Sequence, residues 1–349
     1  MSRSTPLVIH VAYSPLNEVL DLTRIGGIVP GADIVLAAYD LGHDQRTRRS
    51  ETPTATDLAL GEPAISDALR DALARAEVMI TLDAPLDLPV YAPRLRWIQA
   101  IGSGVGQFVP SRLPESPIVL TNAAGIGAIP IAEWVLARVL AVYKRLDEHA
   151  EQQRNHVWNQ KLGGLLAGKR ALVVGLGAIG RQVARRLKAF DVQVVGVIRS
   201  WTPGISSPDA DKVIGPDRLM DALGTAHIVV VSAPGTAANV NLFDARAFAA
   251  MRRGAIFINV ARGSLVDESA LVEALSSGHL RAAAVDVTRQ EPLPADSPLW
   301  DTPNLSISPH SSASADRYLE RVAELFYDNL ARYVAGQDLV NVVDLSREY

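Results

Sequence analysis

Hydrophobic residues recur along the chain in two rhythms, which predict an alternation of strands and helices. Short unbroken apolar runs are typical of buried parallel strands, whereas apolar positions three and four residues apart are typical of helices that pack by one face. In the first hundred residues, apolar runs predict strands over residues 6–12 and 77–82, and a further strand that begins near residue 94 and runs into glycines. Helical spacing predicts a helix over 65–76.

Two longer stretches have helical spacing and predict long amphipathic helices. One covers residues 128–146 and the other covers 314–336. A helix with one apolar stripe buries that stripe against a sheet or another helix. The apolar positions are Ile131, Trp134, Val135, Val139, Val142, Tyr143 and Leu146 in the first stretch, and Leu319, Val322, Phe326, Leu330 and Tyr333 in the second.

From Lys169 onward the alternation is regular. Helical patterns separate apolar strands that are predicted over 170–177, 192–198, 227–234, 255–261 and 280–287. Such alternation indicates a parallel sheet covered by helices on both faces. The sequence therefore predicts a doubly wound parallel-sheet (Rossmann) domain over 101–310. This domain would be inserted in a smaller flavodoxin-like α/β domain made of residues 1–100 and 311–349.

Composition narrows the class of protein. The length of 349 residues suggests about two domains of roughly 150 residues each. The net charge of −4 offers no reason to bind nucleic acid or an anionic membrane. The absence of cysteine excludes disulfides and thiolate metal sites and fits a cytoplasmic location. No metal site is predicted. No membrane span is predicted either, because the most apolar helical stretch is short and contains Glu133 and Arg138.

A glycine-rich turn lies between the strand at 170–177 and the helix that follows it. Gly175, Gly177 and Gly180 form a G-x-G-x-x-G pattern in the strand–turn–helix context that dinucleotide binding requires. The second glycine lets the backbone approach a pyrophosphate, and free N–H groups at the helix start face the phosphates. The residues predicted to bind the cofactor here include Ala178 and Ile179 between the second and third glycines.

The end of the next strand indicates which cofactor is preferred. Ile198 stands where an acidic residue would accept hydrogen bonds from both ribose hydroxyls and repel a 2′-phosphate. Arg199 and Ser200 follow, and their donors suit a phosphate monoester. We therefore predict that NADP(H) is preferred and that NAD(H) is possible. The alternative is that Arg199 is only a solvated residue at a strand end.

Polar residues follow three later apolar strands. Arg262 comes after the strand at 255–261, Asp286 and Glu291 come at and beyond the end of the strand at 280–287, and His310 follows a short apolar run. In an open parallel sheet, ligands bind at the carboxyl ends of the strands. These side chains are therefore expected to point toward one edge of the sheet.

With these motifs in order, the sequence resembles the D-isomer-specific 2-hydroxyacid dehydrogenases over nearly its whole length. The resemblance rests on the glycine-rich turn, on "NVARGSLVDE", on "DVTRQEPLPADSPLW" and on "SPHSS". The sequence is most similar to NADPH-dependent glyoxylate/hydroxypyruvate reductases. The resemblance implies that the central domain binds the nicotinamide cofactor and that the flanking domain binds substrate.

The resemblance also implies a role for each residue of the reacting centre. Arg262 would bind the carboxylate and the carbonyl of a 2-oxo acid, and His310 would donate a proton to the carbonyl oxygen. Glu291 would hold the imidazole and favour its protonated form. Asp286 would orient the nicotinamide. Pro234 and Val260 match family positions that line the nicotinamide ribose.

The loop "IGSGVG" matches the substrate loop of the family. Backbone N–H groups of Ser103 and Gly104 would receive the substrate carboxylate together with Arg262. Gly106 stands where many relatives carry an aspartate, which leaves the anchoring of this loop open.

The sequence thus predicts an oxidoreductase that reduces glyoxylate, hydroxypyruvate or a similar short 2-oxo acid to the D-2-hydroxy acid. One alternative is an NAD-dependent dehydrogenase of another 2-hydroxy acid, such as 3-phosphoglycerate. Another is a non-catalytic protein that senses nucleotides. The resemblance further implies a homodimer, for which the helix from Ile131 and the "HVWNQ" segment would suit a two-fold contact. The alternative for this helix is that it packs inside its own domain.

Overall fold

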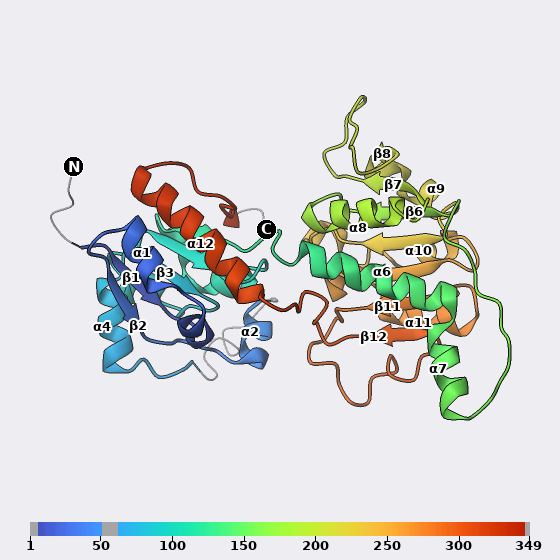
Figure 1. The fold of residues 1–349 in the computed structure, drawn as a ribbon, viewed down its shortest axis with the longest axis horizontal. Coiled ribbons are helices and arrows are strands. Elements are labelled where there is room, and N and C mark those ends of the chain that lie inside the picture. The colour runs from blue at the N-terminus through green and yellow to red at the C-terminus, as the bar shows by residue number, and fades with distance from the viewer. Residues whose placement is uncertain (1–5, 51–61, 346–349) are drawn as a thin grey trace. The chain divides into compact units, whose positions relative to one another are not determined.

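The strands form two separate parallel sheets, one in each of two units of the chain (Figure 1). The computed structural model describes residues 6–50 and 62–345. The first unit combines Met1–Ile126 with Ala315–Tyr349, and the second is Gly127–Ser314. The predicted insertion of one α/β fold into another is therefore what the chain adopts.

The sheet of the first unit has the strand order β2-β1-β3-β4-β5, which is the flavodoxin-like order. All of its neighbouring strands run parallel. Parallel strands need crossovers, and short helices supply most of them here. The strands are β1 (Val8–Val11), β2 (Asp33–Leu36), β3 (Val78–Thr81), β4 (Trp97–Ala100) and β5 (Val119–Thr121).

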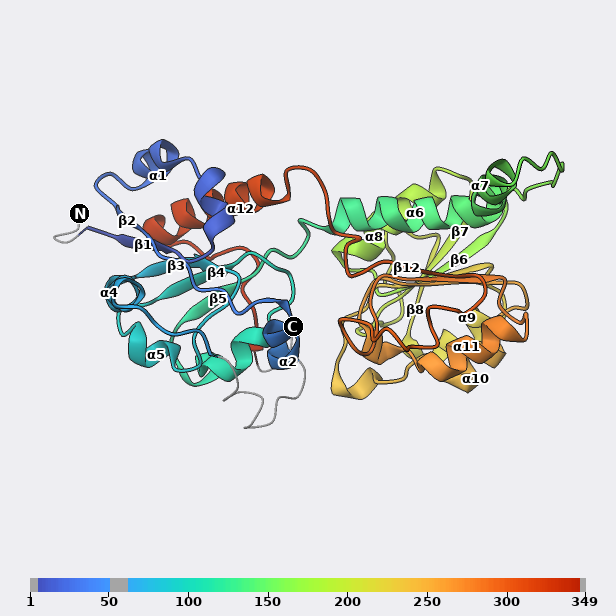
Figure 2. The same cartoon turned by 90° about the horizontal axis from the view of Figure 1, so that it is seen from below.

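Helices cover both faces of this sheet (Figure 2). The apolar sides of α1 and α12 pack on one face with Trp97 at the centre, and those of α4 and α5 pack on the other. The helix predicted near the end of the sequence is α12, and it buries Val322, Phe326 and Leu330 as the spacing indicates. The helices are α1 (Leu22–Ile28), α2 (His43–Ser50), α4 (Asp67–Arg75), α5 (Leu88–Tyr91) and α12 (Tyr318–Ala335).

The sheet of the second unit has the order β8-β7-β6-β9-β10-β11-β12, again parallel throughout. Counted from β6, this is the dinucleotide-binding order with its topological switch between β6 and β9. The strands are β6 (Arg170–Val174), β7 (Gln193–Val197), β8 (Lys212–Ile214), β9 (Ile228–Val231), β10 (Ile256–Asn259), β11 (Ala282–Val285) and β12 (Leu305–Ile307).

Here α6 and α8 cover one face, and α9, α10 and α11 cover the other (Figure 2). The buried side of α6 follows the predicted stripe, with Ile131, Val135, Val139 and Tyr143 in the core. The helix ends two residues before Leu146, because Arg145 adopts a left-handed conformation with φ of 56°. The helices are α6 (Ala128–Lys144), α7 (Leu146–Arg154), α8 (Ala178–Lys188), α9 (Leu219–Leu223), α10 (Ala245–Ala250) and α11 (Glu268–Ser276).

The division between the units differs from the predicted boundaries. The chain leaves the first unit after Ile126 instead of residue 100, and it returns at Ala315 instead of residue 311. The reason for the first difference is β5, which pairs with β4 and completes the first sheet. Its run of three residues is too short to stand out as a strand in the sequence.

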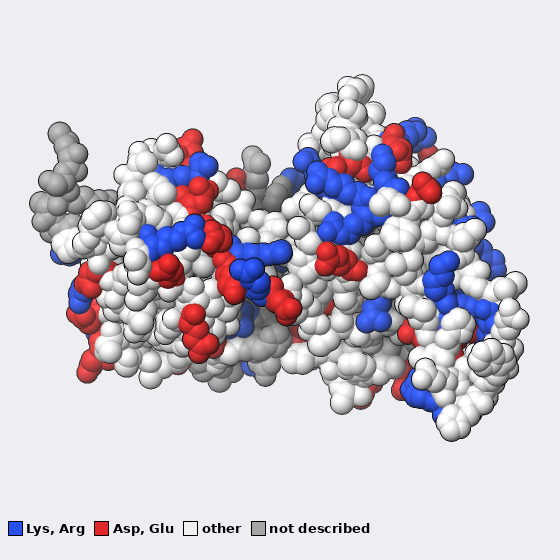
Figure 3. All heavy atoms as spheres, in the orientation of Figure 1, with Lys and Arg blue, Asp and Glu red and all other residues white. Residues whose placement is uncertain are grey.

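Both signs of charge are mixed on the surface seen in Figure 3. Basic side chains of α8 pair with acidic ones: Arg185 contacts Asp209 at 2.5 Å and Lys188 contacts Asp211 at 2.8 Å. Within residues 6–50 and 62–345, no helix has the length and apolar character needed to cross a membrane.

Candidate active site

The glycine-rich turn connects β6 to α8 at the switch point of the second sheet. Gly175 has a φ of +97°, a conformation that side chains rarely adopt. A Cβ on Gly180 would lie 1.9 Å from the carbonyl oxygen of Gly175, so only glycine allows α8 to pack this close to β6. The first and third glycines are therefore required by the fold of the turn itself.

Gly177 differs from its neighbours in the turn. A Cβ built on it meets nothing within 4 Å, so its need for glycine does not come from packing within the chain. It caps the N-terminus of α8, whose first residues are Ala178 and Ile179. Open space beside a helix N-terminus with free N–H groups fits a pyrophosphate. The turn can therefore hold the phosphates of a dinucleotide.

The residues after β7 lie next to this turn, because the Gly175 N–H donates to the Val197 carbonyl at 2.9 Å. Ile198 packs against the hydrophobic core, whereas Arg199 and Ser200 are exposed. The isoleucine is thus needed for packing, and the two polar residues face solvent. Pro234 after β9 is also exposed, and Val260 after β10 is buried.

The reacting residues predicted from the sequence follow three neighbouring strands. Arg262 follows β10, Glu291 lies in the loop after β11, and His310 follows β12. These strands are adjacent and parallel, so their carboxyl ends lie along one edge. The structure brings the three residues to the same edge of the second unit.

His310 and Glu291 are in direct contact. The imidazole Nδ1 lies 2.7 Å from Oε2 of the carboxylate. The other carboxylate oxygen, Oε1, accepts the N–H of Thr288 at 3.1 Å. Because Nδ1 is engaged with Glu291, Nε2 is the ring atom left for a substrate. The imidazole is half exposed, while the carboxylate is mostly buried.

Opposing effects act on the pKa of Glu291. Burial alone would raise it, but the hydrogen bond and charge of His310, the Thr288 N–H and the charge of Arg262 together lower the pKa below its usual value. The carboxylate therefore stays ionised at neutral pH. The ionised carboxylate faces Nδ1 of His310, which leaves Nε2 directed away from Glu291.

Arg262 is held by the end of strand β10. The fully buried Asn259 side chain accepts the Ala261 N–H at 3.0 Å and donates to the Arg262 carbonyl at 2.9 Å. Arg262 is exposed, and its Nη1 donates to the Ala261 carbonyl at 2.7 Å. Partial desolvation by neighbouring protein atoms lowers the pKa of Arg262, and the charge of Glu291 opposes the shift. An arginine remains cationic under such conditions, so the site offers a fixed positive charge.

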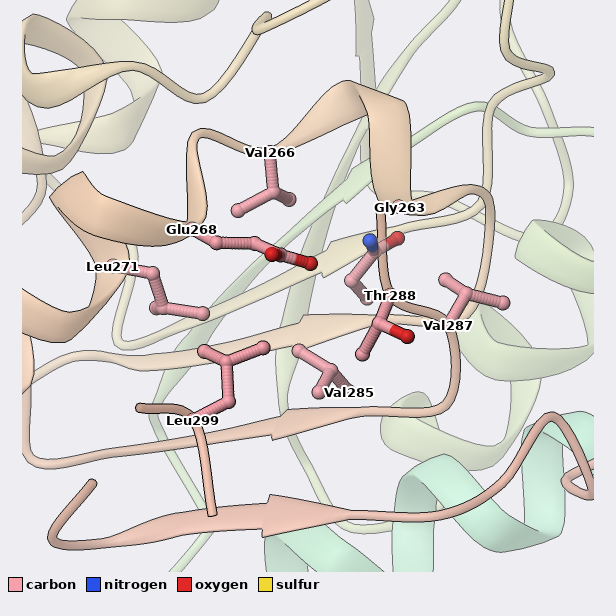
Figure 4. Close-up of a pocket in the computed structure, with 9 residues that line it drawn as sticks. Gly263, Val266, Glu268, Leu271, Val285, Val287, Thr288 and Leu299 are labelled. Carbon is pink, nitrogen blue, oxygen red and sulfur yellow. The ribbon is translucent and has the colours of Figure 1, made fainter. Parts of the chain in front are cut away.

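Gly263 brings the Arg262 loop against the Glu291 loop. A Cβ on Gly263 would lie 2.0 Å from the Thr288 carbonyl group. In Figure 4, Gly263 and Thr288 lie side by side, and the Glu268 side chain extends toward them among apolar residues. The Glu268 carboxylate accepts the Arg289 N–H at 2.6 Å. Helix α11 thus also supports the loop that carries Glu291.

Replacing Gly263 with alanine is expected to destabilise the second unit and to displace the Glu291 loop, because the new methyl group would overlap backbone atoms that cannot rotate away. We expect a loss of about 3 kcal/mol in the free energy of unfolding, at the upper end of overpacking effects. Denaturant unfolding measures it. Gly26→Ala is the control, since a Cβ there meets nothing within 4 Å. Equal stability of both variants would contradict the packing described.

Asp286 is buried at the end of β11, and its carboxylate accepts hydrogen bonds from Ser308, Ser311 and Ser312 in the loop that carries His310. The expectation that Asp286 orients the nicotinamide stays a prediction. Sequence reasoning did not identify Asn259, Glu268 or the serines as parts of the site. The signal for Asn259 was a polar residue at the end of an apolar strand, within the "NVARG" motif.

Ser103 and Gly104 belong to the first unit, in the loop after β4. This loop has anchors although Gly106 replaces the usual aspartate. The Asn122 side chain donates to the Ser103 carbonyl at 2.9 Å, and Gln107 donates to the Leu82 carbonyl at 3.0 Å. The role of the two residues in binding a carboxylate stays a prediction.

Comparison with known proteins agrees with this architecture. The family model described as the NAD binding domain of D-isomer specific 2-hydroxyacid dehydrogenases matches residues 136–312. The chain is 32% identical over 260 residues to a D-3-phosphoglycerate dehydrogenase of Archaeoglobus fulgidus. That match covers 73% of this chain but 48% of the relative, so the chain spans about half of that protein's length.

Two further proteins are similar over most of their own length. A glyoxylate/hydroxypyruvate reductase B of Citrobacter koseri is 32% identical over 258 residues, which cover 72% of this chain and 79% of that protein. The structure of a D-isomer specific 2-hydroxyacid dehydrogenase of Xanthobacter autotrophicus, solved with NADPH and MES, superposes with a TM-score of 0.78 at 27% identity. The superposition covers 99% of this chain and 100% of the Xanthobacter autotrophicus chain. From the fold, the strand-end residues and these matches together, the chain belongs to the D-isomer-specific 2-hydroxyacid dehydrogenase family.

Proposed function

We propose that the protein reduces a short 2-oxo acid, such as glyoxylate or hydroxypyruvate, to the D-2-hydroxy acid with a nicotinamide cofactor. The observation that carries the proposal is the 2.7 Å contact between His310 Nδ1 and Glu291 Oε2, within electrostatic reach of Arg262. A cation, a proton donor and a carboxylate that supports the donor are the groups that carbonyl reduction needs. The similarity to the Citrobacter koseri reductase supports the choice of substrate.

Each residue has one task in this reaction. Arg262 binds the substrate carboxylate and turns the carbonyl carbon toward the cofactor. His310 donates its Nε2 proton to the carbonyl oxygen, and Glu291 balances the positive charge on the ring until the proton leaves. When bound, the reduced nicotinamide supplies the hydride to C2. In the reverse direction, His310 removes the proton from the hydroxyl group.

We propose NADPH as the preferred cofactor. Ile198 cannot repel a 2′-phosphate, and the exposed Arg199 and Ser200 offer it donors beside the glycine-rich turn. The Xanthobacter autotrophicus relative, which was solved with NADPH, supports this choice.

Replacing Arg199 with alanine is expected to reduce the preference for NADPH over NADH about tenfold to a hundredfold, because hydrogen bonds to charged groups contribute roughly 1.5–3 kcal/mol. Values of kcat/KM measured with both cofactors give the preference. Arg218→Ala is the matched control, because this exposed arginine of the same unit pairs with Asp221. An unchanged preference in the Arg199 variant would show that another feature selects the cofactor.

A steady-state assay tests the substrate. Glyoxylate, hydroxypyruvate, pyruvate and phosphohydroxypyruvate are offered with NADPH and with NADH, and loss of the reduced nicotinamide absorbance is followed. Rapid turnover of glyoxylate or hydroxypyruvate supports the proposal. Turnover of phosphohydroxypyruvate alone favours the phosphoglycerate dehydrogenase alternative, for which the similarity to the Archaeoglobus fulgidus enzyme is the supporting observation. Tight nucleotide binding without turnover favours a nucleotide sensor.

We further propose that two copies associate through the segment between α7 and β6. The buried side of α6 packs inside its own unit, so this helix is not the main candidate for the contact. The segment projects from the second unit in Figure 2. Four of its large apolar side chains are exposed to solvent. Exposed groups of this kind mark interaction sites. They are Val157, Trp158, Leu162 and Leu165.

Replacing Trp158, which is 100% exposed, with aspartate is expected to convert a dimer into a monomer. A buried carboxylate at the contact would lose its hydration without gaining a partner. Light scattering after size exclusion should give twice the chain mass of 37.4 kDa for the wild type and one chain mass for the variant. Trp158→Phe should keep the dimer, as it preserves the apolar contact. A monomeric wild type would contradict the proposed association.

A further inference from the structure

Two consecutive residues after β5 hold the loop that follows β4, all within the first unit. The Ala123 N–H donates to the Gly102 carbonyl at 2.9 Å. The side-chain amide of Asn122 donates to the next carbonyl of the loop, that of Ser103, at 2.9 Å. The first contact uses backbone atoms, which every residue has. The second contact exists only because residue 122 has an amide side chain.

The contact to the Ser103 carbonyl also sets the direction of the Gly104 N–H. A planar trans peptide unit points its carbonyl and its N–H in opposite directions. The bond between Ser103 and Gly104 is trans, so holding the carbonyl toward Asn122 turns the Gly104 N–H to the other side of the loop. Within residues 6–50 and 62–345, no group accepts the N–H of Ser103 or of Gly104. Such free N–H groups are suited to binding an anion.

The amide of Asn122 is itself fixed in one orientation. Its Oδ1 accepts the Ala124 N–H at 3.0 Å, which leaves the NH₂ group facing Ser103. A flipped amide would place the NH₂ group against a donor and the oxygen against a carbonyl. The residue is 9% exposed, and its backbone N–H donates to the Asn341 carbonyl at 3.1 Å. Asn122 therefore joins the loop to a part of the first unit that is already held in place.

We propose that Asn122 is a positioning residue for the substrate carboxylate. By holding the Ser103 carbonyl, it directs the Gly104 N–H toward the side on which the carboxylate binds. This inference rests on the proposed function and on the predicted role of the loop in binding substrate. Gln107 ties the far end of the loop to the Leu82 carbonyl, but its side chain is not bonded to the peptide unit of Ser103 and Gly104.

Replacing Asn122 with alanine is expected to raise the KM for glyoxylate about tenfold to a hundredfold, the effect of one hydrogen bond to a charged group. The Gly104 N–H would bind the carboxylate equally in the ground state and the transition state, so kcat should stay within about threefold. The Kd for NADPH from fluorescence titration should change little. An unchanged KM overturns the inference. A Kd weakened as much as the KM also overturns it, because that would show a general disturbance of the fold.

A serine at position 122 separates the contact to the loop from the turn at Ala124. A serine hydroxyl can accept the N–H two residues further on, as the asparagine oxygen does. Its side chain is shorter and does not extend to the Ser103 carbonyl, so Asn122→Ser should raise the KM as alanine does. A serine variant with the wild-type KM would assign the effect to the turn and overturn the inference.

Asn341→Ala is the matched control. The Asn341 side chain donates to the carbonyls of Asn122 at 3.3 Å and of Ala124 at 2.9 Å, and it makes no hydrogen bond to the loop. The control should lower stability and leave the KM unchanged. An equal rise of the KM in Asn341→Ala would attribute the effect to the stability of this segment and would contradict the positioning role.

Hydrogen–deuterium exchange provides a readout that does not depend on turnover. The Phe108 N–H donates to the Val105 carbonyl at 2.9 Å, at the far end of the loop. Exchange of this N–H should be faster in both Asn122 variants than in Asn341→Ala, even if the wild type reduces none of the 2-oxo acids offered. Such a result would separate a failure of the proposed function from a failure of this inference. Wild-type exchange in both Asn122 variants would show that the loop does not depend on Asn122, and it would overturn the inference.

Discussion

Replacing His310 with asparagine is expected to lower kcat by about 10²- to 10⁴-fold, the usual contribution of a positioned general acid. The affinity for NADPH should change little, because His310 follows β12 at the edge of the second sheet. Strands β11, β10 and β9 separate β12 from β6, which leads into the glycine-rich turn. The imidazole has Nδ1 on Glu291 and Nε2 left for substrate, so asparagine at this position has no titratable proton to donate. Initial rates and a fluorescence titration with NADPH measure the two quantities.

The control for His310 is a histidine of the same unit that makes a structural contact. His279 Nε2 lies 2.9 Å from the Met251 carbonyl, and His279→Asn should keep kcat within a few fold. If His310→Asn reduced glyoxylate at the wild-type rate, the proton donor would have to be another group. The pair with Glu291 would then be only structural.

Replacing Arg262 with alanine is expected to raise KM and lower kcat together, with a fall of about 10²- to 10⁴-fold in kcat/KM. Two charge-assisted hydrogen bonds to a carboxylate and carbonyl, at roughly 1.5–3 kcal/mol each, account for this range. Loss in both constants is expected because the arginine both binds the substrate and orients it for reaction. Steady-state kinetics over a range of substrate concentrations separate the two effects.

Arg262→Lys should recover only a part of the lost activity, since lysine keeps the charge but lacks the planar fork of donors. Arg253→Ala is the control, as this exposed arginine lies in the turn before β10. If the Arg262→Ala variant had a higher KM but an unchanged kcat, Arg262 would bind the substrate without orienting it for reaction. That result would contradict the orienting role.

Most elements of the fold could be predicted from periodicity, and the failures share a cause. The long strands and helices carry enough residues for their apolar spacing to be recognised, as in α6 and α12. Three strands that escaped prediction are β5 and β8, with three residues each, and β2, with four. A pattern that short does not distinguish a strand from a loop. The boundary near residue 100 was misplaced for the same reason.

The sequence by itself determined the residue types of the site and the order in which they follow the strands. Arg262, Glu291 and His310 could be named because each follows an apolar run, and parallel strands end at one edge. The glycines of the turn could be named because their spacing matches a backbone requirement, which Gly175 and Gly180 meet in the structure. Both inferences depend on neighbours along the chain, which a sequence displays.

Only the tertiary structure decided which groups hold these residues in place. The contact of Gly263 with Thr288, that of Glu268 with Arg289 and those of Asp286 with the 308–312 loop join segments that are separate in sequence. Their partners are mostly backbone atoms, which every residue possesses and no motif marks. Hydrogen bonding and close packing depend on distances that are set only when the strands have paired, and for this reason the supporting residues could not be read from the order of amino acids.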